Sequence, residues 1–165
     1  MKKSNQRTKT GPAAPAETTM VPSAAKDGPS PEAYGAVVKQ ADLSNLQLIA
    51  SSFALNPMYF STPAEQRELA FDFEIDQDIH SPKDGVGSAV FRWWVEARVG
   101  ETVLLRAEAS FLIIYQGLSD VNSHAVKMFI RRVGRFATYP YFRSHVAQLS
   151  WESRADLPPM PVLRE

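Results

Sequence analysis

Cysteine is absent from the 165 residues of this sequence. Its absence excludes disulfide frameworks, thiolate zinc sites and thiol nucleophiles together. Long apolar runs are also missing, since no segment approaches the roughly twenty residues that a membrane helix requires. The basic start of the chain leads into Gly, Pro, Ala and Thr instead of an apolar signal core. We therefore expect a cytoplasmic protein that does not insert into a membrane.

An excess of charge of one sign is lacking as well, because 18 basic and 18 acidic side chains cancel. Binding to nucleic acid requires a net or locally dense positive field, so nucleic acid is not an expected partner. The three histidines, His80, His124 and His145, lie in no metal-ligand spacing and beside no serine and aspartate that would form a catalytic set. The sequence predicts no enzyme, no metal site and no cofactor.

Composition divides the chain into two parts. Residues 1–33 are rich in Pro, Ala, Ser and Lys and show no apolar periodicity that would dock them on a core. We expect a disordered tail there. Residues 34–165 have the apolar and aromatic content of one globular domain, which is also what this length allows.

Four segments, near residues 44–55, 69–76, 89–98 and 103–114, alternate apolar and polar side chains as strands with one buried face do. Short reversals join neighbouring antiparallel strands, so the simplest topology is a four-stranded meander. The side chains expected to face the core in the last three segments are Leu69, Phe71, Phe73, Ile75, Ala89, Phe91, Trp93, Val95, Ala97, Val103, Leu105, Ala107, Ala109, Phe111 and Ile113.

Helical signals follow the strands. Ser119 or Asp120 can cap a helix that extends to Gly134, a residue that commonly ends helices. A second helix is predicted from about Thr138, with Pro140 in its first turn, where the missing amide hydrogen costs nothing. Strands followed by helices predict an α+β fold, a four-stranded antiparallel sheet with C-terminal helices packed on one face.

The run GRFATYPYFRSHVAQLSWESRADLPPMPVL, residues 134–163, resembles part of the SecB family of protein-export chaperones. In that family, an aromatic Tyr-Pro-Tyr or Phe-Pro-Tyr sequence precedes a helix that contains an arginine, and an extended segment with prolines follows. Tyr139-Pro140-Tyr141 and Arg143 match best, and the Gly100-Glu101 reversal extends the similarity over residues 42–163. The sequence of this run is most similar to the SecB-like branch of the family, and some members of that branch serve toxin–antitoxin systems.

The resemblance implies an ATP-independent holdase that binds unfolded or precursor polypeptides for export, forms homodimers or homotetramers and meets the translocase ATPase SecA. Two features depart from the export pattern. Export SecB proteins end the first strand with the sequence Phe-Glu-Ala-Pro, whereas residues 53–57 here read Phe-Ala-Leu-Asn-Pro and lack the glutamate. We also expect no second long helix after the proline-rich segment. Both departures favour the alternative, a dedicated chaperone or assembly factor for one partner such as an antitoxin. A small-ligand pocket between sheet and helices is a third hypothesis.

Aromatic and methionine side chains suit promiscuous recognition, because they offer large, adaptable contact area. They are concentrated after the first strand, around the Tyr-Pro-Tyr step and in the proline-rich segment, although part of this set could instead fill the core. The predicted polypeptide-binding residues are Phe53, Leu55, Met58, Tyr59, Phe60, Tyr139, Tyr141, Phe142, Leu157 and Met160.

Apolar side chains also fall on the otherwise charged face of the strands, where either a neighbouring subunit or a client must cover them. The predicted subunit interface consists of Trp94, Leu112 and Ile114 on that face, with Val146 and Leu149 on the second helix. By the resemblance, SecA would dock on the acidic residues Asp72, Glu74, Asp76 and Glu101. Without the resemblance, the acidic row of β-type alternation indicates a solvated strand face, or a site for calcium or a basic partner; this row consists of Asp72, Glu74, Asp76 and Asp78.

Overall fold

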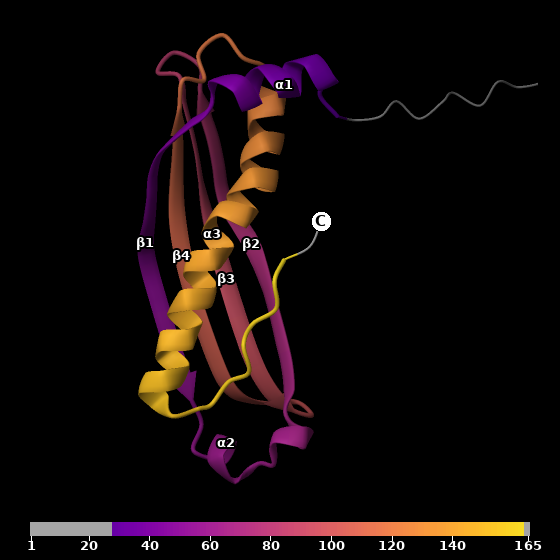
Figure 1. The fold of residues 1–165 in the computed structure, drawn as a ribbon, viewed down its shortest axis with the longest axis vertical. Helices are drawn as coiled ribbons and strands as arrows, with labels where there is room; N and C mark the ends of the chain where they lie inside the picture. The colour runs from indigo at the N-terminus through magenta and orange to yellow at the C-terminus, as the bar shows by residue number, and fades with distance from the viewer. Residues whose placement is uncertain (1–27, 164–165) are drawn as a thin grey trace, which may run out of the picture.

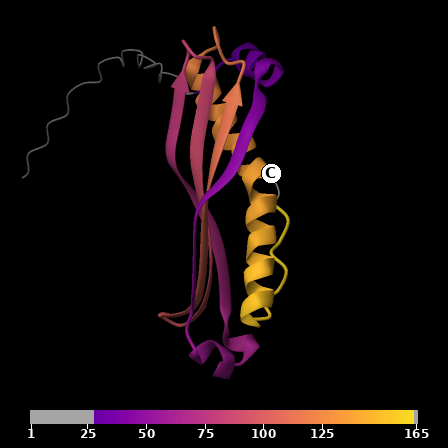
Figure 2. The same ribbon diagram turned by 90° about the vertical axis from the view of Figure 1, so that its left-hand side faces the viewer.

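The computed structural model describes residues 28–163 of the chain. They form one antiparallel sheet with a long helix across one face, so the predicted α+β class is confirmed (Figures 1 and 2). Residues 1–27 of the expected tail lie outside the described residues. In chain order the elements are α1 Pro31–Gln40, β1 Asp42–Leu55, α2 Met58–Ser61, the short 3-10 helix Ala64–Gln66, β2 Glu68–Ser81, β3 Val86–Val99, β4 Thr102–Gln116 and α3 Ser123–Ser153.

Helix α1 was not predicted, and it includes residues 31–33 of the segment expected to be tail. The hydroxyl of Ser30 accepts a hydrogen bond from the Ala33 amide at 3.2 Å, and Pro31 occupies the first turn, where prolines are favoured. Val37 is fully buried, and the ring of Tyr34 lies 6.3 Å from that of Phe129 in α3. Only one residue of α1 is fully buried, so the apolar stripe was too short to recognise in the sequence.

The sheet has the order β1-β4-β3-β2, so the predicted meander is wrong for the first strand. Strands β2, β3 and β4 do follow one another through short turns, including the reversal at Gly100, whose φ is +54°. Strand β1 pairs instead with β4, and residues 56–67 cross the end of the sheet to its far edge. We call residues 56–67 the crossover. It contains α2 and the 3-10 helix and is too long to be a hairpin turn.

The alternation correctly predicted which face of β3 and β4 is buried. The alternate residues of β3 are all buried in the two core clusters, namely Ala89, Phe91, Trp93, Val95 and Ala97. In β4 the expected alternation breaks at its start, where Val103 is 38% exposed and Leu104 is buried. Between Ala97 and Arg98 the pairing with β4 shifts register, so Leu104 is the extra residue of a bulge. Within residues 28–163, no helix covers the opposite side of the sheet, and we call this side the open face (Figure 2).

Helix α3 runs without interruption from Ser123 to Ser153, where two helices had been predicted. Its N-cap is Asn122, whose side chain accepts from the Ala125 amide at 3.0 Å, and not Ser119 or Asp120. Pro140 lies inside the helix, so the carbonyl one turn earlier loses its usual amide partner. None of the helices between residues 28 and 163 combines the length and apolar character needed to cross a membrane.

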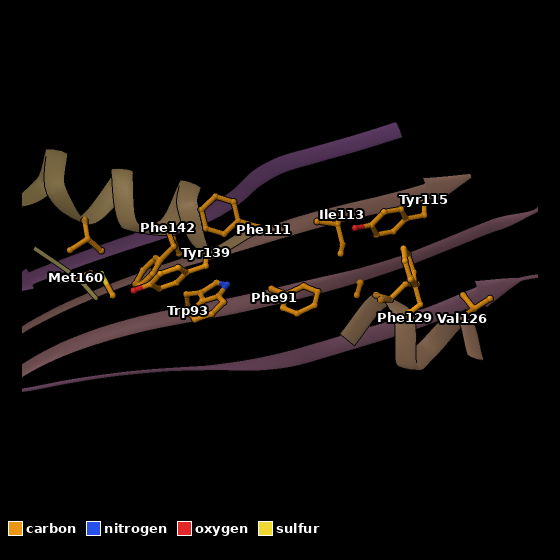
Figure 3. Packing of buried hydrophobic residues seen from close by; sticks show 14 of the residues in the cluster. Phe91, Trp93, Phe111, Ile113, Tyr115, Val126, Phe129, Tyr139, Phe142 and Met160 are labelled. Atoms are coloured by element: carbon orange, nitrogen blue, oxygen red, sulfur yellow. The ribbon is translucent and has the colours of Figure 1, made fainter. Parts of the chain in front are cut away.

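Gly134 lies inside α3, at a place where the helix backbone packs directly against side chains of the sheet. A Cβ atom at this position would lie 2.6 Å from the Phe91 ring and 2.5 Å from the Ile113 side chain. One turn later, the Thr138 hydroxyl accepts a 2.9 Å hydrogen bond from the Trp93 indole and donates at 2.8 Å to the Gly134 carbonyl. Trp93 also stacks on Phe142, with ring centroids 5.8 Å apart (Figure 3). Helix and sheet are therefore locked together at the centre of the core.

Replacing Gly134 by alanine should destabilise the protein by about 1–3 kcal/mol, because the new methyl group overpacks against buried side chains. Urea unfolding measures this free energy. The matched control is Gly35→Ala in α1, where a Cβ meets nothing within 4 Å and helix propensity predicts a gain of roughly 0.5–1 kcal/mol. Equal effects of the two substitutions would contradict the close approach.

Candidate functional site

The crossover is held in place by one buried aromatic residue. Tyr59 of α2 is 2% exposed, and its hydroxyl donates a 2.8 Å hydrogen bond to the Ala155 carbonyl beyond the end of α3. The Arg67 guanidinium lies 4.1 Å from the centre of the Tyr59 ring, a cation–π geometry. With Tyr59 turned inward, its neighbours Met58 and Phe60 remain 54% and 56% exposed. The fold thus displays two large apolar side chains on a fixed loop.

A groove of about 390 Å³ lies between the crossover, the start of β2 and the segment that follows α3. Leu69 lines it and is 38% exposed, so the first residue expected to face the core from β2 reaches a groove instead. The groove is lined by Tyr59, Ala64, Arg67, Leu69, Ala97, Asp156, Leu157, Pro158 and Pro159. Exposed Met58 and Phe60 lie in the crossover, which also supplies three of the lining residues, Tyr59, Ala64 and Arg67. This end of the molecule is the candidate polypeptide-binding surface.

Residues 154–163 form an extended segment that we call the strap. Helix α3 ends as Arg154 takes a left-handed conformation with φ of +55°. The strap then runs back beside α3 on its β2 side (Figure 1). The Leu157 amide donates to the Ser150 hydroxyl at 2.8 Å, and the Tyr139 hydroxyl donates to the Pro161 carbonyl. Met160 is 4% exposed and packs in the core cluster.

The residues predicted to bind polypeptide divide into three groups. Tyr59, Tyr139, Phe142 and Met160 are buried, so in this conformation they form the core and not a contact surface. Phe53, Leu55 and Leu157 are partly buried against the two core clusters. Met58, Phe60 and Tyr141 are more than half exposed. The apolar periodicity of the helix already favoured a core position for Phe142. Tyr139 packs against Trp93, with the two ring centroids 5.1 Å apart.

Trp151 is an exposed aromatic residue that the sequence reasoning missed. It is 85% exposed on the last turn of α3 and lines a hollow of about 700 Å³ with Ala147 and Arg154. Its position was a usable signal, because a large apolar residue outside the Phe142, Val146 and Leu149 stripe points away from the core. Trp151 adds apolar area at the same end of α3 as the crossover.

The residues predicted for a subunit interface occupy two different places. Trp94, Leu112 and Ile114 are half-buried on the open face, and the Arg106 guanidinium lies 5.9 Å from the centre of a Trp94 ring. Val146 is buried and Leu149 is partly buried, both packed in this chain's own core. The two α3 residues therefore serve the contact between helix and sheet, whereas the three open-face residues remain available to a partner.

The acidic residues predicted for SecA docking lie along β2 and in the turn after β3. Arg92 pairs with Glu74 at 2.7 Å and with Asp76 at 2.5 Å, so part of the acidic row is neutralised within the sheet. Asp72 accepts a hydrogen bond from the Phe73 amide at 2.8 Å, and Glu101 is exposed in the reversal. Across residues 28–163 no group of acidic or histidine side chains is arranged to hold a metal ion. The structure provides no calcium site in the part of the chain it describes.

Two histidines connect elements of the fold. The Nδ1 and Nε2 atoms of His80 each lie 2.9 Å from a partner, the Ser123 hydroxyl and the Leu118 carbonyl. His145 of α3 lies with its Nε2 atom 2.7 Å from the Ser51 hydroxyl of β1. Both side chains therefore connect helix α3, or the loop that leads into it, to the sheet.

Glu96 is a nearly buried carboxylate on the open face, with 6% of its side chain exposed. Desolvation acts to raise its pKa, but hydrogen bonds from Arg98 and Arg106 hold that pKa below its ordinary value of 4.5. Arg106 also bonds to Glu108 at 2.8 Å, which extends the network across β3 and β4. A carboxylate whose folded-state pKa is lowered stabilises the fold above its unfolded pKa, and this contribution disappears as the pH falls through the folded value.

Glu96→Gln should lower the free energy of unfolding at neutral pH by on the order of 1–3 kcal/mol, because two charge-assisted hydrogen bonds are weakened. The difference between wild type and variant should shrink as the pH falls below 4.5, the ordinary pKa of glutamate. Denaturant unfolding at a series of pH values measures it. A difference that stays constant down to strongly acidic pH would show that the Glu96 carboxylate is not stabilised by its arginine partners.

A sheet in the order β1-β4-β3-β2, roofed on one face by a long helix that a proline-rich strap follows, is a SecB-like fold. Among solved structures the chain is similar to the Mycobacterium tuberculosis Rv1957 SecB-like chaperone, in complex with a ChAD peptide from the Rv1956 HigA1 antitoxin. The TM-score is 0.65 at 20% sequence identity, and the match covers 81% of this chain and 98% of the other. No protein-family model and no curated protein matches the sequence.

Proposed function

We propose that this chain is an ATP-independent chaperone that binds unfolded or precursor polypeptides in the cytoplasm. The observation that carries the proposal is the apolar surface at the crossover end, where exposed Met58 and Phe60 lie on the loop that walls the groove containing Leu69. Capture there needs no nucleotide, because burial of each such side chain contributes ~1.5–3 kcal/mol. The SecB-like fold, and the antitoxin peptide bound by the similar M. tuberculosis chaperone, support a polypeptide ligand.

The client range distinguishes two forms of the proposal. A general export holdase would accept many precursors and deliver them to SecA through the acidic residues of β2 and Glu101. A dedicated chaperone would serve one partner, such as an antitoxin. The second form has one specific observation in its favour, the antitoxin peptide in complex with the similar chaperone. Arg92 also neutralises part of the acidic row, which weakens β2 as a docking surface for a basic partner.

Replacing Met58 and Phe60 together by serine should weaken binding of an unfolded client by about tenfold or more, because both side chains lose their apolar contact area. Suppression of aggregation of a slowly refolding protein, measured by light scattering without ATP, reports this loss. Val38→Ser is the matched control, since Val38 is 52% exposed on α1 at the other end of the molecule (Figure 1).

Wild type that fails to suppress aggregation would overturn the proposed function. Equal activity of wild type and the double variant would show that clients bind to a surface other than the crossover. Purifying the protein from its native host and identifying what co-purifies separates the two forms of the proposal. A mixture of unrelated precursors supports the export holdase, and a single stoichiometric partner supports the dedicated chaperone.

We further propose that the chain functions as a homodimer or homotetramer. Trp94, Leu112 and Ile114 present apolar area on the open face, which α3 does not cover. Strand β1 lies at an edge of the sheet with Leu48 and Ile49 43% and 49% exposed, and edges of this kind pair readily with other chains. Several subunits would offer one unfolded client many weak sites, which raises the overall affinity.

The variants Ile114→Lys and Ile49→Lys should each lower the molar mass measured by light scattering after size-exclusion chromatography, because a charge would be buried at the subunit contact. The two variants test the open face and the β1 edge separately. Val38→Lys, an equally polar change on exposed α1, should leave the mass as it is in wild type. A monomeric wild type would contradict the proposed assembly while leaving the client surface intact.

A further inference from the structure

The strap is an extended polypeptide that lies in a groove of its own chain. It contains Pro158, Pro159 and Pro161, which have no amide hydrogen and prevent it from joining the sheet as a strand. Among residues 156–163, no backbone group bonds to another backbone group. Side chains of α3 hold it instead, through the Ser150 hydroxyl at the Leu157 amide and the Tyr139 hydroxyl at the Pro161 carbonyl.

This mode of holding a chain does not depend on the sequence that is held. A hydroxyl that bonds to a backbone amide or carbonyl recognises any extended segment, whatever its side chains are. Apolar anchoring is concentrated at Met160, which is 4% exposed and packs in the cluster that contains Trp93 and Phe142 (Figure 3). Leu157 is a second, half-buried anchor. Backbone contacts from side chains together with an apolar anchor are what a polypeptide-binding groove requires.

The strap also separates two hollows. The groove of about 390 Å³ at the crossover and a hollow of about 230 Å³ beside α3 are both lined by Leu157, Pro158 and Pro159. The second hollow reaches Arg143 and Val146 of the helix. Because these three strap residues line both hollows, withdrawal of the strap would open the two hollows to each other.

We propose that the strap is a built-in competitor, which occupies the groove along α3 until an extended client segment displaces it. The partner is a segment of unfolded polypeptide with an apolar anchor such as methionine or leucine, and proline is tolerated because the strap itself carries it. The inference rests on the proposed function and adds a binding mode to it. Clients would first meet exposed Met58 and Phe60 and then exchange with the strap.

The test compares full-length Met160→Ser with wild type. The probe is a fluorescent peptide with the sequence of the strap, RADLPPMPVL, and fluorescence anisotropy measures its affinity. A strap docked about nine-tenths of the time lowers the apparent affinity of a competitor about tenfold, so the variant should bind the peptide about tenfold more tightly. Val162→Ser is the matched control in the same segment, because Val162 is 69% exposed, and it should behave as wild type does.

Equal or weaker peptide binding by a folded Met160→Ser variant would overturn the proposal. Hydrogen exchange on the wild-type chain gives an independent result, which decides the question even if the variant does not fold. Adding an unfolded client should speed exchange at the Leu157 amide, which would lose its hydrogen bond to the Ser150 hydroxyl. Unchanged exchange at this amide with client bound would also overturn the proposal. Failure of the proposed function looks different, because wild type would then bind no unfolded client at all.

Discussion

The whole arrangement depends on the close approach of α3 to the centre of the sheet. Gly134 lets the helix backbone lie against Phe91 and Ile113, and Thr138 bonds to the indole of Trp93 one turn later. Because these contacts are near the middle of a 31-residue helix, they set the path of both of its ends. The N-terminal end meets α1, and the C-terminal end delivers the strap to the crossover, where Tyr59 bonds to Ala155.

One helix covers only one face, and this leaves the sheet with two surfaces of different chemistry. On the helix side, the sheet and α3 bury an apolar core between them, and Met58, Phe60 and Leu69 remain accessible at the crossover end. On the open face, Glu96, Arg98 and Arg106 form ion pairs around half-buried Trp94. The first surface suits the variable apolar contacts of an unfolded chain. The second combines fixed charges with apolar area, as interfaces between folded subunits do.

Strand faces were predictable because alternation is a local property of the chain. The core positions from Ala89 to Ala97 follow from their period of two, and so does the solvent side of β2. The errors arose where distant residues decide the outcome. Strand β1 pairs with β4 because the crossover carries the chain to the far edge of the sheet, and the bulge at Leu104 changes which residue of β4 is buried. No local pattern records either event.

By itself, the sequence determined the α+β class, the strands with their buried faces, and the concentration of aromatic residues around the Tyr-Pro-Tyr step. The tertiary structure alone decided which of these aromatics form a surface. Tyr139 and Phe142 are buried in contact with Trp93. Three other aromatic residues are exposed, namely Phe60, Tyr141 and Trp151. It also decided that Gly134 and Pro140 lie within one helix. The physical reason is that burial is a property of packed neighbours, and a helix-ending residue is retained when the contacts on both sides of it are strong enough.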